Sequence, residues 1–304
     1  MFKEITSVDN KIVKDAVKLL DKKARAQTNK FLAEGILLVK EAVLACPDLI
    51  DTIFLDKTKL ESKPEQFTHF TESEKLKSKI ILLPPNIFKK IADTLTPQGI
   101  IAVVNKPQFN INSASALKGA DVGALAGAVT GGVLGGVLGE TSKFLLLDSL
   151  QNPDNLGTII RTAKATGFNT IFLLNCTDPY APKVVRGSMG AIFGTAIFEI
   201  DRGELLDLLS KNDIPIISAC VSGVNLFELL GEVGASQKSK GQNKTESLPN
   251  KFCLALGSEA YGLSEAVLSA SKMRISLPMQ NNTESLNVAV AGGVLMYFLS
   301  NLSK

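Results

Sequence analysis

Five polar residues, far apart in the chain, could do chemistry together: Asn155, Arg161, Glu259, Ser285 and Asn287. An arginine held in a site can stabilise negative charge that develops on a substrate oxygen, because its guanidinium stays protonated. Amide and carboxylate side chains can bind a hydroxyl group or orient that arginine. Each residue type also has an ordinary alternative as a helix surface charge, a turn or cap residue, or a carboxylate at a helix start.

The back half of the chain supplies strands and helices that could position these residues. Apolar runs predict buried strands, and residues 156–167 predict a helix closed by a glycine. Arg161 would lie on the face of this helix that also carries Thr158 and Lys164. The alternation indicates a doubly wound α/β domain. The expected strands are 144–148, 170–175, 214–221 and 251–257.

The last segment begins as a strand at 274–277 and breaks at Pro278, which has no amide proton for a sheet. Ser285 could cap the helix that follows, whose apolar residues recur at helical spacing. Gly292 and Gly293 would weaken this helix by about 1 kcal/mol each relative to alanine. We therefore expect another element to pack closely against them.

Together these segments resemble the motifs of the SpoU (TrmH-like) family of RNA ribose 2′-O-methyltransferases. Asn155 and Arg161 fit the first motif, N-x-G-x-x-x-x-R read loosely, and Glu259 occupies the glutamate position of the second. Ser285-Leu286-Asn287 fits the Ser-Leu-Asn of the third. The resemblance implies that all five polar residues are catalytic, with Arg161 at the centre. It also implies a C-terminal parallel-sheet domain with a trefoil knot of the SPOUT type.

The resemblance implies S-adenosyl-L-methionine as the cofactor, held by backbone of the knotted loops. By spacing alone, Gly257 and Gly262 indicate only a strand-to-helix turn, since neither G-x-G-x-x-G nor a P-loop is present. Small residues there would let the chain pass closely. The implied cofactor-binding residues are Leu256, Gly257, Gly262, Ile275, Leu277, Met279 and Leu286.

A smaller α/β domain is expected at residues 1–107, from strand-like runs with helical stretches between them. Residues 7–45 read as two helices around a basic turn that contains Lys22, Lys23 and Arg25. By physics alone such a cluster is a solvated helix face or a phosphate-contacting surface. The run K-K-x-R followed by F-x-x-E-G resembles the L30e/L7Ae-like substrate-binding domain of many SpoU proteins, which favours contact with RNA. The expected strands are 51–55, 80–83 and 99–105.

Residues 182–194, which follow the second expected strand of the catalytic domain, also resemble the corresponding segment of the family. This resemblance makes Arg186 and Ser188 candidates for contact with RNA or with a protein interface.

Composition fits a two-domain globular protein: 304 residues, 45% hydrophobic and 21% charged. Residues 1–107 carry 18 Lys/Arg against 14 Asp/Glu, a net charge of +4, and the remainder carries 15 against 16, a net charge of −1. This division of charge suits RNA binding by the N-terminal part and catalysis by the C-terminal part. A solvated surface would also explain so small an excess of positive charge.

Residues 108–142 predict a linker between a binding domain (1–107) and a catalytic domain (143–304). Val122 to Gly139 is uncharged over 18 residues, of which seven are glycine. That composition favours a flexible linker over an ordered packing segment or a membrane contact. The polar stretch 235–250 is expected to be a mobile loop.

Several function classes are disfavoured. The four cysteines form no C-x-x-C pair and His69 is the only histidine, so no metal site is expected and a Ser-His-Asp hydrolase lacks a suitable base. Reduced thiols and a start without an apolar run indicate the cytoplasm. A nucleotide-dependent oxidoreductase would need the absent phosphate-binding fingerprint.

The sequence therefore predicts S-adenosylmethionine-dependent methylation of a ribose 2′-hydroxyl in structured RNA. Ribosomal RNA is favoured over transfer RNA because the minimal transfer-RNA enzymes of the family lack a front domain. The alternatives are a transfer-RNA 2′-O-methyltransferase and a catalytically silent RNA-binding member of the fold. Family members are usually homodimers through the catalytic domain, and the apolar helix at 287–302 could supply that surface. No membrane partner is expected.

Overall fold

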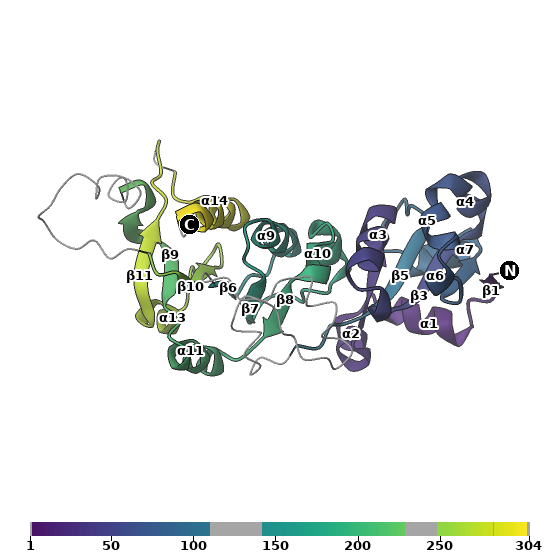
Figure 1. Cartoon of the computed structure of the whole chain (residues 1–304), viewed down its shortest axis with the longest axis horizontal. Coiled ribbons are helices and arrows are strands. Elements are labelled where there is room, and N and C mark those ends of the chain that lie inside the picture. The colour runs from purple at the N-terminus through teal and green to yellow at the C-terminus, as the bar shows by residue number, and fades with distance from the viewer. Residues whose placement is uncertain (1, 110–141, 229–247, 282, 303–304) are drawn as a thin grey trace, which may run out of the picture. The chain divides into compact units, whose positions relative to one another are not determined.

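The computed structural model describes residues 2–109, 142–228, 248–281 and 283–302 (Figure 1). By its contacts the chain divides into two compact units. Among the described residues, the first unit contains 2–108 and 178–194, and the second contains the others. Most of the expected linker at 108–142 and of the expected loop at 235–250 lies outside the described residues.

The first unit is built on a five-stranded mixed sheet in the order β1-β4-β3-β5-β2. Strands β1, β4 and β3 are parallel, and β5 is antiparallel to both of its neighbours. Strand β2 was not expected, because residues 7–45 were predicted to form two helices around a basic turn; its pairing with distant β5 buries it. The strands are β1 (Lys3–Glu4), β2 (Lys30–Glu34), β3 (Ile50–Asp56), β4 (Ile80–Leu83) and β5 (Ile100–Asn105).

Helices cover this sheet, and the basic run forms one of them. The carboxylate of Asp21 accepts a hydrogen bond from the backbone N–H of Lys23 at 2.7 Å and so caps α2, where a turn was expected. Asn29 ends α2 in a left-handed conformation. The helices of this unit are α1 (Lys11–Lys18), α2 (Lys22–Thr28), α3 (Ile36–Ala45), α4 (Lys57–Ser62), α5 (Thr68–Thr71), α6 (Glu74–Lys77), α7 (Pro85–Ile91) and α10 (Pro182–Gly187), with 3-10 turns η1 (Pro47–Leu49), η2 (Pro64–Gln66) and η3 (Ala191–Gly194).

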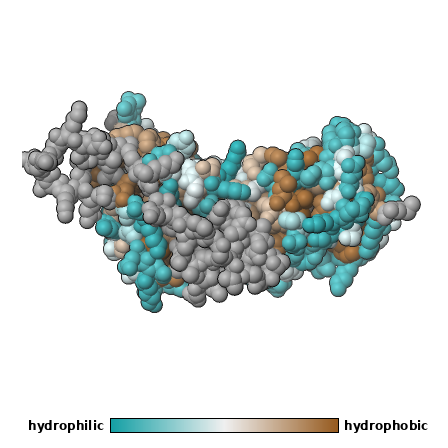
Figure 2. Space-filling model, viewed as in Figure 1, coloured by the Kyte–Doolittle hydropathy of each residue, from teal (hydrophilic) through white to brown (hydrophobic). Residues whose placement is uncertain are grey.

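Part of the first unit's surface is apolar. Hydrophobic residues gather around α3 on the face shown in Figure 2, and Leu37 and Leu44 of α3 are 51% and 62% exposed. No helix within the described residues is long and apolar enough to span a membrane.

The second unit is built on a six-stranded, wholly parallel sheet in the order β11-β9-β10-β6-β7-β8. This confirms the expected α/β fold with a parallel sheet. Figure 1 shows α9 and α14 side by side along one face, with α11 toward the other. The strands are β6 (Ser142–Asp148), β7 (Thr170–Leu174), β8 (Ala196–Glu199), β9 (Ile216–Asn225), β10 (Lys251–Gly257) and β11 (Ser271–Ser276), and the helices are α9 (Pro153–Ala165), α11 (Arg202–Lys211), α13 (Glu265–Ser269) and α14 (Val288–Leu302).

The strand order reverses beside β6. From β6 the chain proceeds outward through β7 and β8, and then crosses to β9 and β10 on the other side of β6. Ligands of open parallel sheets bind at such a reversal, outside the carboxyl ends of the strands. Here those ends are Asp148 of β6 and Gly257 of β10, which are paired in register.

The two glycines of α14 lie against neighbouring elements, as expected. A Cβ on Gly292 would lie 2.6 Å from Cδ1 of Leu256 in β10. A Cβ on Gly293 would lie 3.7 Å from Cγ2 of Thr162 in α9. These approaches bring α14 onto β10 and α9, which places its first turn beside the carboxyl end of β10.

Candidate active site

A cavity of about 390 Å³ opens where the carboxyl end of β10 meets β11 and the start of α14. Its wall is mainly apolar, with Glu259, Glu284 and Ser285 among its polar residues. All seven residues proposed from the sequence to bind the cofactor line this cavity, namely Leu256, Gly257, Gly262, Ile275, Leu277, Met279 and Leu286.

The loop that follows β10 forms one wall of the cavity and leaves no room for a side chain at its start. A Cβ on Gly257 would lie 2.1 Å from the carbonyl carbon of Gly262, a distance that real Cβ atoms essentially never show. Ser258 and Gly262 exchange two backbone hydrogen bonds, of 3.1 and 2.9 Å, across this turn. Gly262 has φ +66°, which favours glycine. The backbone itself therefore forms this side of the cavity.

A chain of hydrogen bonds joins the three motif segments. Nδ2 of Asn155, in the first turn of α9, donates to Oε1 of Glu259 in the loop after β10. Nδ2 of Asn287 donates to Oδ1 of Asn155 at 3.0 Å. Residues more than 100 positions apart are thus held as one cluster beside the cavity. Asn155 is buried there.

Asn287 also caps α14, and the expectation that Ser285 would do so is wrong. Oδ1 of Asn287 accepts hydrogen bonds from the backbone N–H groups of Ala289 at 2.9 Å and Val290 at 3.3 Å. Helix α14 begins at Val288, so Ser285 precedes it by too much to reach these donors. Ser285 instead lies exposed in the cavity wall.

Arg161 is exposed on α9, and no described residue pairs with it. A carboxylate could orient Arg161, but no ion pair between Arg161 and Glu259 is found among the described residues; Glu259 accepts a hydrogen bond from Asn155. Arg161 lies six residues beyond Asn155, about 9 Å along the helix axis. It is not among the residues that line the cavity. A guanidinium in this position is available to a ligand from solvent.

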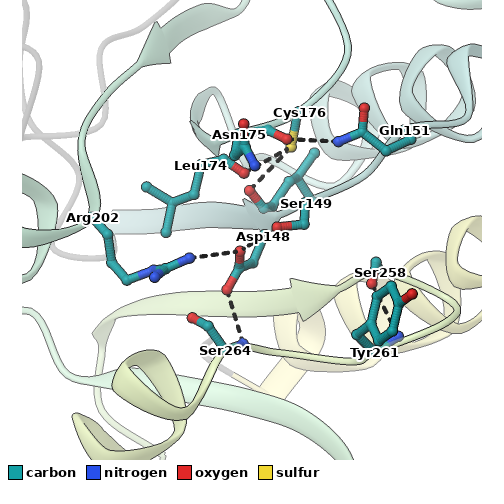
Figure 3. A network of polar contacts seen from close by, with 11 residues as sticks. Asp148, Ser149, Gln151, Leu174, Asn175, Cys176, Arg202, Ser258, Tyr261 and Ser264 are labelled. Carbon is teal, nitrogen blue, oxygen red and sulfur yellow. Dashed lines mark hydrogen bonds and ion pairs between the residues drawn. The ribbon is translucent and has the colours of Figure 1, made fainter.

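Sequence reasoning missed Tyr261 and Asp148. Tyr261 lines the mouth of the cavity with 92% of its surface exposed. Asp148 is 1% exposed at the end of β6 and contacts Ser149, Arg202 and Ser264 (Figure 3). An aspartate at the end of the apolar run FLLLD was the available signal, since a buried carboxylate needs partners.

Cys176 lies close to this network. Its Sγ is within 3.3 Å of the Leu147 carbonyl oxygen, a donor–acceptor pair. Burial raises the pKa of the Cys176 thiol to about 11. The thiol therefore stays protonated at neutral pH and does not serve as a nucleophile. Among the described residues, no three His, Cys, Asp or Glu side chains gather in a group that could hold a metal ion.

The basic run divides into two kinds of residue. Lys22 and Lys23 are exposed on α2. Arg25 is 3% exposed; its Nε lies 2.8 Å from Oδ2 of Asp178, and one of its amino groups donates to the carbonyl of Leu19 at 2.8 Å. The expectation that Arg25 contacts RNA phosphate is therefore corrected, because its guanidinium is enclosed within the first unit.

Arg186 and Ser188 also have partners inside the first unit. One amino group of Arg186 lies 2.7 Å from Asp93, and the other lies 3.9 Å from Glu34. Ser188 is fully buried, and its hydroxyl donates to the carbonyl of Val185 at 2.7 Å. Ser188 is thus not an RNA contact in this structure, and Arg186 serves as an ion-pair partner within the unit.

The SpoU rRNA Methylase family matches residues 142–297, more than half of the chain. The chain belongs to the SpoU rRNA methylase family. A second family, the MRM3-like substrate binding domain, matches residues 10–102. The SpoU match contains all five candidate catalytic residues, and the MRM3-like match contains Lys22 and Lys23.

Relatives of this SpoU protein align over almost its whole length. The 23S rRNA (guanosine(2553)-2′-O)-methyltransferase RlmP of Bacillus subtilis is 30% identical, over 98% of this chain and 99% of the relative. The mitochondrial rRNA methyltransferase 3A of Danio rerio is 26% identical, over 97% of this chain and 69% of the relative. The AdoMet-bound rRNA methyltransferase from Sinorhizobium meliloti has a TM-score of 0.70 at 22% identity, over 99% of this chain and 98% of that one. This last likeness supports the fold.

Proposed function

We propose that this SpoU protein methylates the 2′-hydroxyl of a ribose in ribosomal RNA, with S-adenosyl-L-methionine as the methyl donor. The observation that carries the proposal is the hydrogen-bonded cluster of Asn155, Glu259 and Asn287, which gathers the three SpoU motifs beside one cavity. The RlmP relative, which is named as a 23S rRNA 2′-O-methyltransferase, supports this substrate class.

The cavity fits the proposed cofactor. Its apolar lining suits an adenosyl group, and the close backbone approach at Gly257 and Gly262 leaves backbone polar groups, not side chains, to bind the ligand's edges. When bound, S-adenosylmethionine supplies a methyl group on a sulfonium centre. The protein's part is to hold the acceptor oxygen in line with that methyl group and to exclude water.

We assign Arg161 to the acceptor oxygen. Its guanidinium is a fixed cation, so it stabilises the negative charge that develops on the ribose 2′-oxygen during methyl transfer, and the hydroxyl proton is released to solvent. Asn155 is held from both sides by Glu259 and Asn287, and its assigned role is to fix the geometry of the three segments around the ribose. Ser285 is assigned to a substrate contact at the exposed rim.

RNA capture is assigned to the first unit. Lys22 and Lys23 are exposed, and lysines contribute to RNA binding mainly through phosphate contacts and counterion release. The MRM3-like match over residues 10–102 supports substrate binding by this unit. Arg25 is not included, because it is buried against Asp178.

Three further assignments belong to the proposal. The catalytic domain dimerises through α14, on which Val290 and Tyr297 are 53% and 67% exposed and seven residues apart, on one face. The loops around the cavity form the trefoil knot of SPOUT proteins. The protein acts in the cytoplasm.

The function is tested with purified protein and ribosomal RNA. Calorimetric titration should detect S-adenosylmethionine binding, and tritium from labelled cofactor should enter 23S rRNA as a 2′-O-methyl group, mapped by resistance of the adjacent bond to alkali. Methylation of transfer RNA alone would replace the proposal with the transfer-RNA alternative. Cofactor binding without transfer to either RNA would support the catalytically silent alternative.

A further inference from the structure

Asp148 occupies the point where the strand order reverses, but it belongs to none of the motif positions assigned above. It is the last residue of β6 and is paired in register with Gly257, the last residue of β10. The loop from Ser258 to Leu263 leaves the sheet directly after Gly257. The backbone of Asp148 therefore lies beside the start of the loop that carries Glu259.

The side chain of Asp148 binds the other end of the same loop. Its Oδ2 accepts a hydrogen bond from the backbone N–H of Ser264 at 3.0 Å, where α13 begins (Figure 3). Its Oδ1 accepts from the hydroxyl of Ser149 at 3.0 Å and lies 3.7 Å from an amino group of Arg202. One residue thus holds both ends of the loop, by the strand ladder at Gly257 and by its carboxylate at Ser264.

The Asp148 carboxylate is buried, so it depends on the hydrogen bond from Ser264 for its stability. Asp148 is 1% exposed, and a buried carboxylate requires such donors because it has lost its hydration. The ion pair is the weaker contact, since 42% of the Arg202 side chain is exposed and solvent screens the pair. Without the carboxylate, the N–H of Ser264 loses its acceptor, and the far end of the loop loses its attachment to β6.

We propose that Asp148 is a positioning residue that fixes the loop 258–263, and through it Glu259, Asn155 and the cofactor cavity. This inference rests on the proposed function for its consequence in catalysis. The hydrogen bond from Ser264 transmits the effect, and the charge of Arg202 contributes little. Asp148 itself touches neither the ribose nor the methyl group.

Four variants separate this role from a general structural one. Asp148→Ala removes the acceptor, whereas Asp148→Asn retains a side-chain oxygen for the Ser264 N–H. Ser264→Pro removes the same N–H donor without changing Asp148, the Ser264 hydroxyl that is also lost has no described hydrogen-bond partner, and the φ of −63° at Ser264 suits proline. Arg202→Met removes only the charge partner. Asp201→Ala is the matched control: its carboxylate accepts from the N–H of Gly203 at 2.8 Å at the start of α11 and has no described hydrogen bond to the loop.

Hydrogen–deuterium exchange of peptides covering 258–264 tests the positioning without any ligand. Exchange should accelerate by about tenfold or more in Asp148→Ala and Ser264→Pro, since each loses the same hydrogen bond, and the double variant should add little to either. Asp148→Asn, Arg202→Met and Asp201→Ala should stay near wild type. Wild-type exchange in both Asp148→Ala and Ser264→Pro would overturn the proposal.

Calorimetric titration with S-adenosylmethionine tests the consequence. The dissociation constant should rise about tenfold in Asp148→Ala and Ser264→Pro, and return to within about threefold of wild type in Asp148→Asn. An equal loss of affinity in Asp201→Ala or Arg202→Met would overturn the proposal in favour of general destabilisation. If Asp148→Ala does not fold, the dissociation constants of Ser264→Pro and Asp201→Ala are compared, and the proposal requires a rise in Ser264→Pro alone. If the wild type binds no S-adenosylmethionine, the proposed function fails, and the exchange comparison still decides the positioning role.

Discussion

At the scale of single residues, the same residue type serves opposite purposes in this protein. Arg25 is enclosed and paired with Asp178, so its charge is neutralised inside the first unit. Arg161 is exposed, and no described residue pairs with it. An arginine that no described residue pairs with keeps its charge and its donors for a ligand. This contrast supports the assignment of Arg161, and not Arg25, to RNA.

Replacement of Arg161 should separate catalysis from cofactor binding. We expect Arg161→Ala to retain less than about a tenth of the methyl-transfer rate, because the developing alkoxide loses its cation. Cofactor affinity should change by less than about twofold, because Arg161 does not line the cavity. Arg161→Lys should also fail, since an ammonium cannot reproduce the planar fork of donors. Single-turnover transfer rates and calorimetric titration measure the two quantities; a variant with more than a tenth of the rate would contradict the central role of Arg161.

At the scale of elements, local patterns predicted the strands better than the helix starts. Strands β4 and β10 begin and end where the apolar runs predicted them, because a continuous buried run marks a strand by itself. Strand β2 was missed because its pairing with β5, about 70 residues away, overrides its local appearance. The cap of α14 was assigned to Ser285 because serine and asparagine are both good caps, and only the geometry selects Asn287.

The cavity was only partly predictable, because some of its contacts join elements that are far apart in the sequence. Family resemblance identified the seven residues in its wall, but spacing alone indicated only a turn at Gly257 and Gly262. The contacts of Asp148 with Ser264, 116 residues away, depend on the strand order, and no local pattern encodes that order. Asp148, which joins distant elements but stands at none of the motif positions, is therefore a part of the site that sequence reasoning missed.

The turn after β10 should not tolerate a side chain at Gly257. Its Cβ would meet the backbone of Gly262 at 2.1 Å, and backbone cannot move aside as a flexible side chain would. We expect Gly257→Ala to lower the free energy of unfolding by about 1–3 kcal/mol and to abolish cofactor binding, since the turn forms the cavity wall. Urea unfolding and calorimetric titration check both effects.

Gly293→Ala is the matched control for this change. Its Cβ would meet Thr162 at 3.7 Å, an ordinary van der Waals distance, and alanine is favoured over glycine in a helix by about 1 kcal/mol. This variant should bind cofactor normally and unfold no more easily than wild type. Normal cofactor binding by Gly257→Ala would show that the turn is not the wall described here.

At the scale of the whole molecule, the division into units does not follow the order of the chain. Residues 178–194 interrupt the second unit in sequence, between β7 and β8, yet their contacts belong to the first unit. Within it, Tyr180 lies with its ring centroid 4.8 Å from that of Phe31, and Asp178 pairs with Arg25. Residues 178–194, which the sequence analysis placed in the catalytic domain, therefore complete the first unit. The charge of Arg25 is neutralised by Asp178 of this segment.

The RNA-binding and structural parts of the basic run should consequently separate by mutation. Lys22→Gln with Lys23→Gln should weaken RNA binding across sequences and reduce the slope of log affinity against log salt by about 2, since two fewer phosphates are neutralised. Stability should hardly change, because both lysines are exposed. Binding isotherms at several salt concentrations, with urea unfolding alongside, measure these effects.

Arg25→Gln should show the reverse pattern. Loss of one partner of a buried ion pair leaves the other unpaired, so the free energy of unfolding should fall by about 3–5 kcal/mol. Asp178 is the residue left unpaired, with its side chain only 6% exposed. The protein that remains folded should bind RNA with the wild-type salt slope, because the Arg25 guanidinium is enclosed and neutralises no phosphate. A variant of wild-type stability with a reduced slope would instead place Arg25 on the RNA and Asp178 elsewhere.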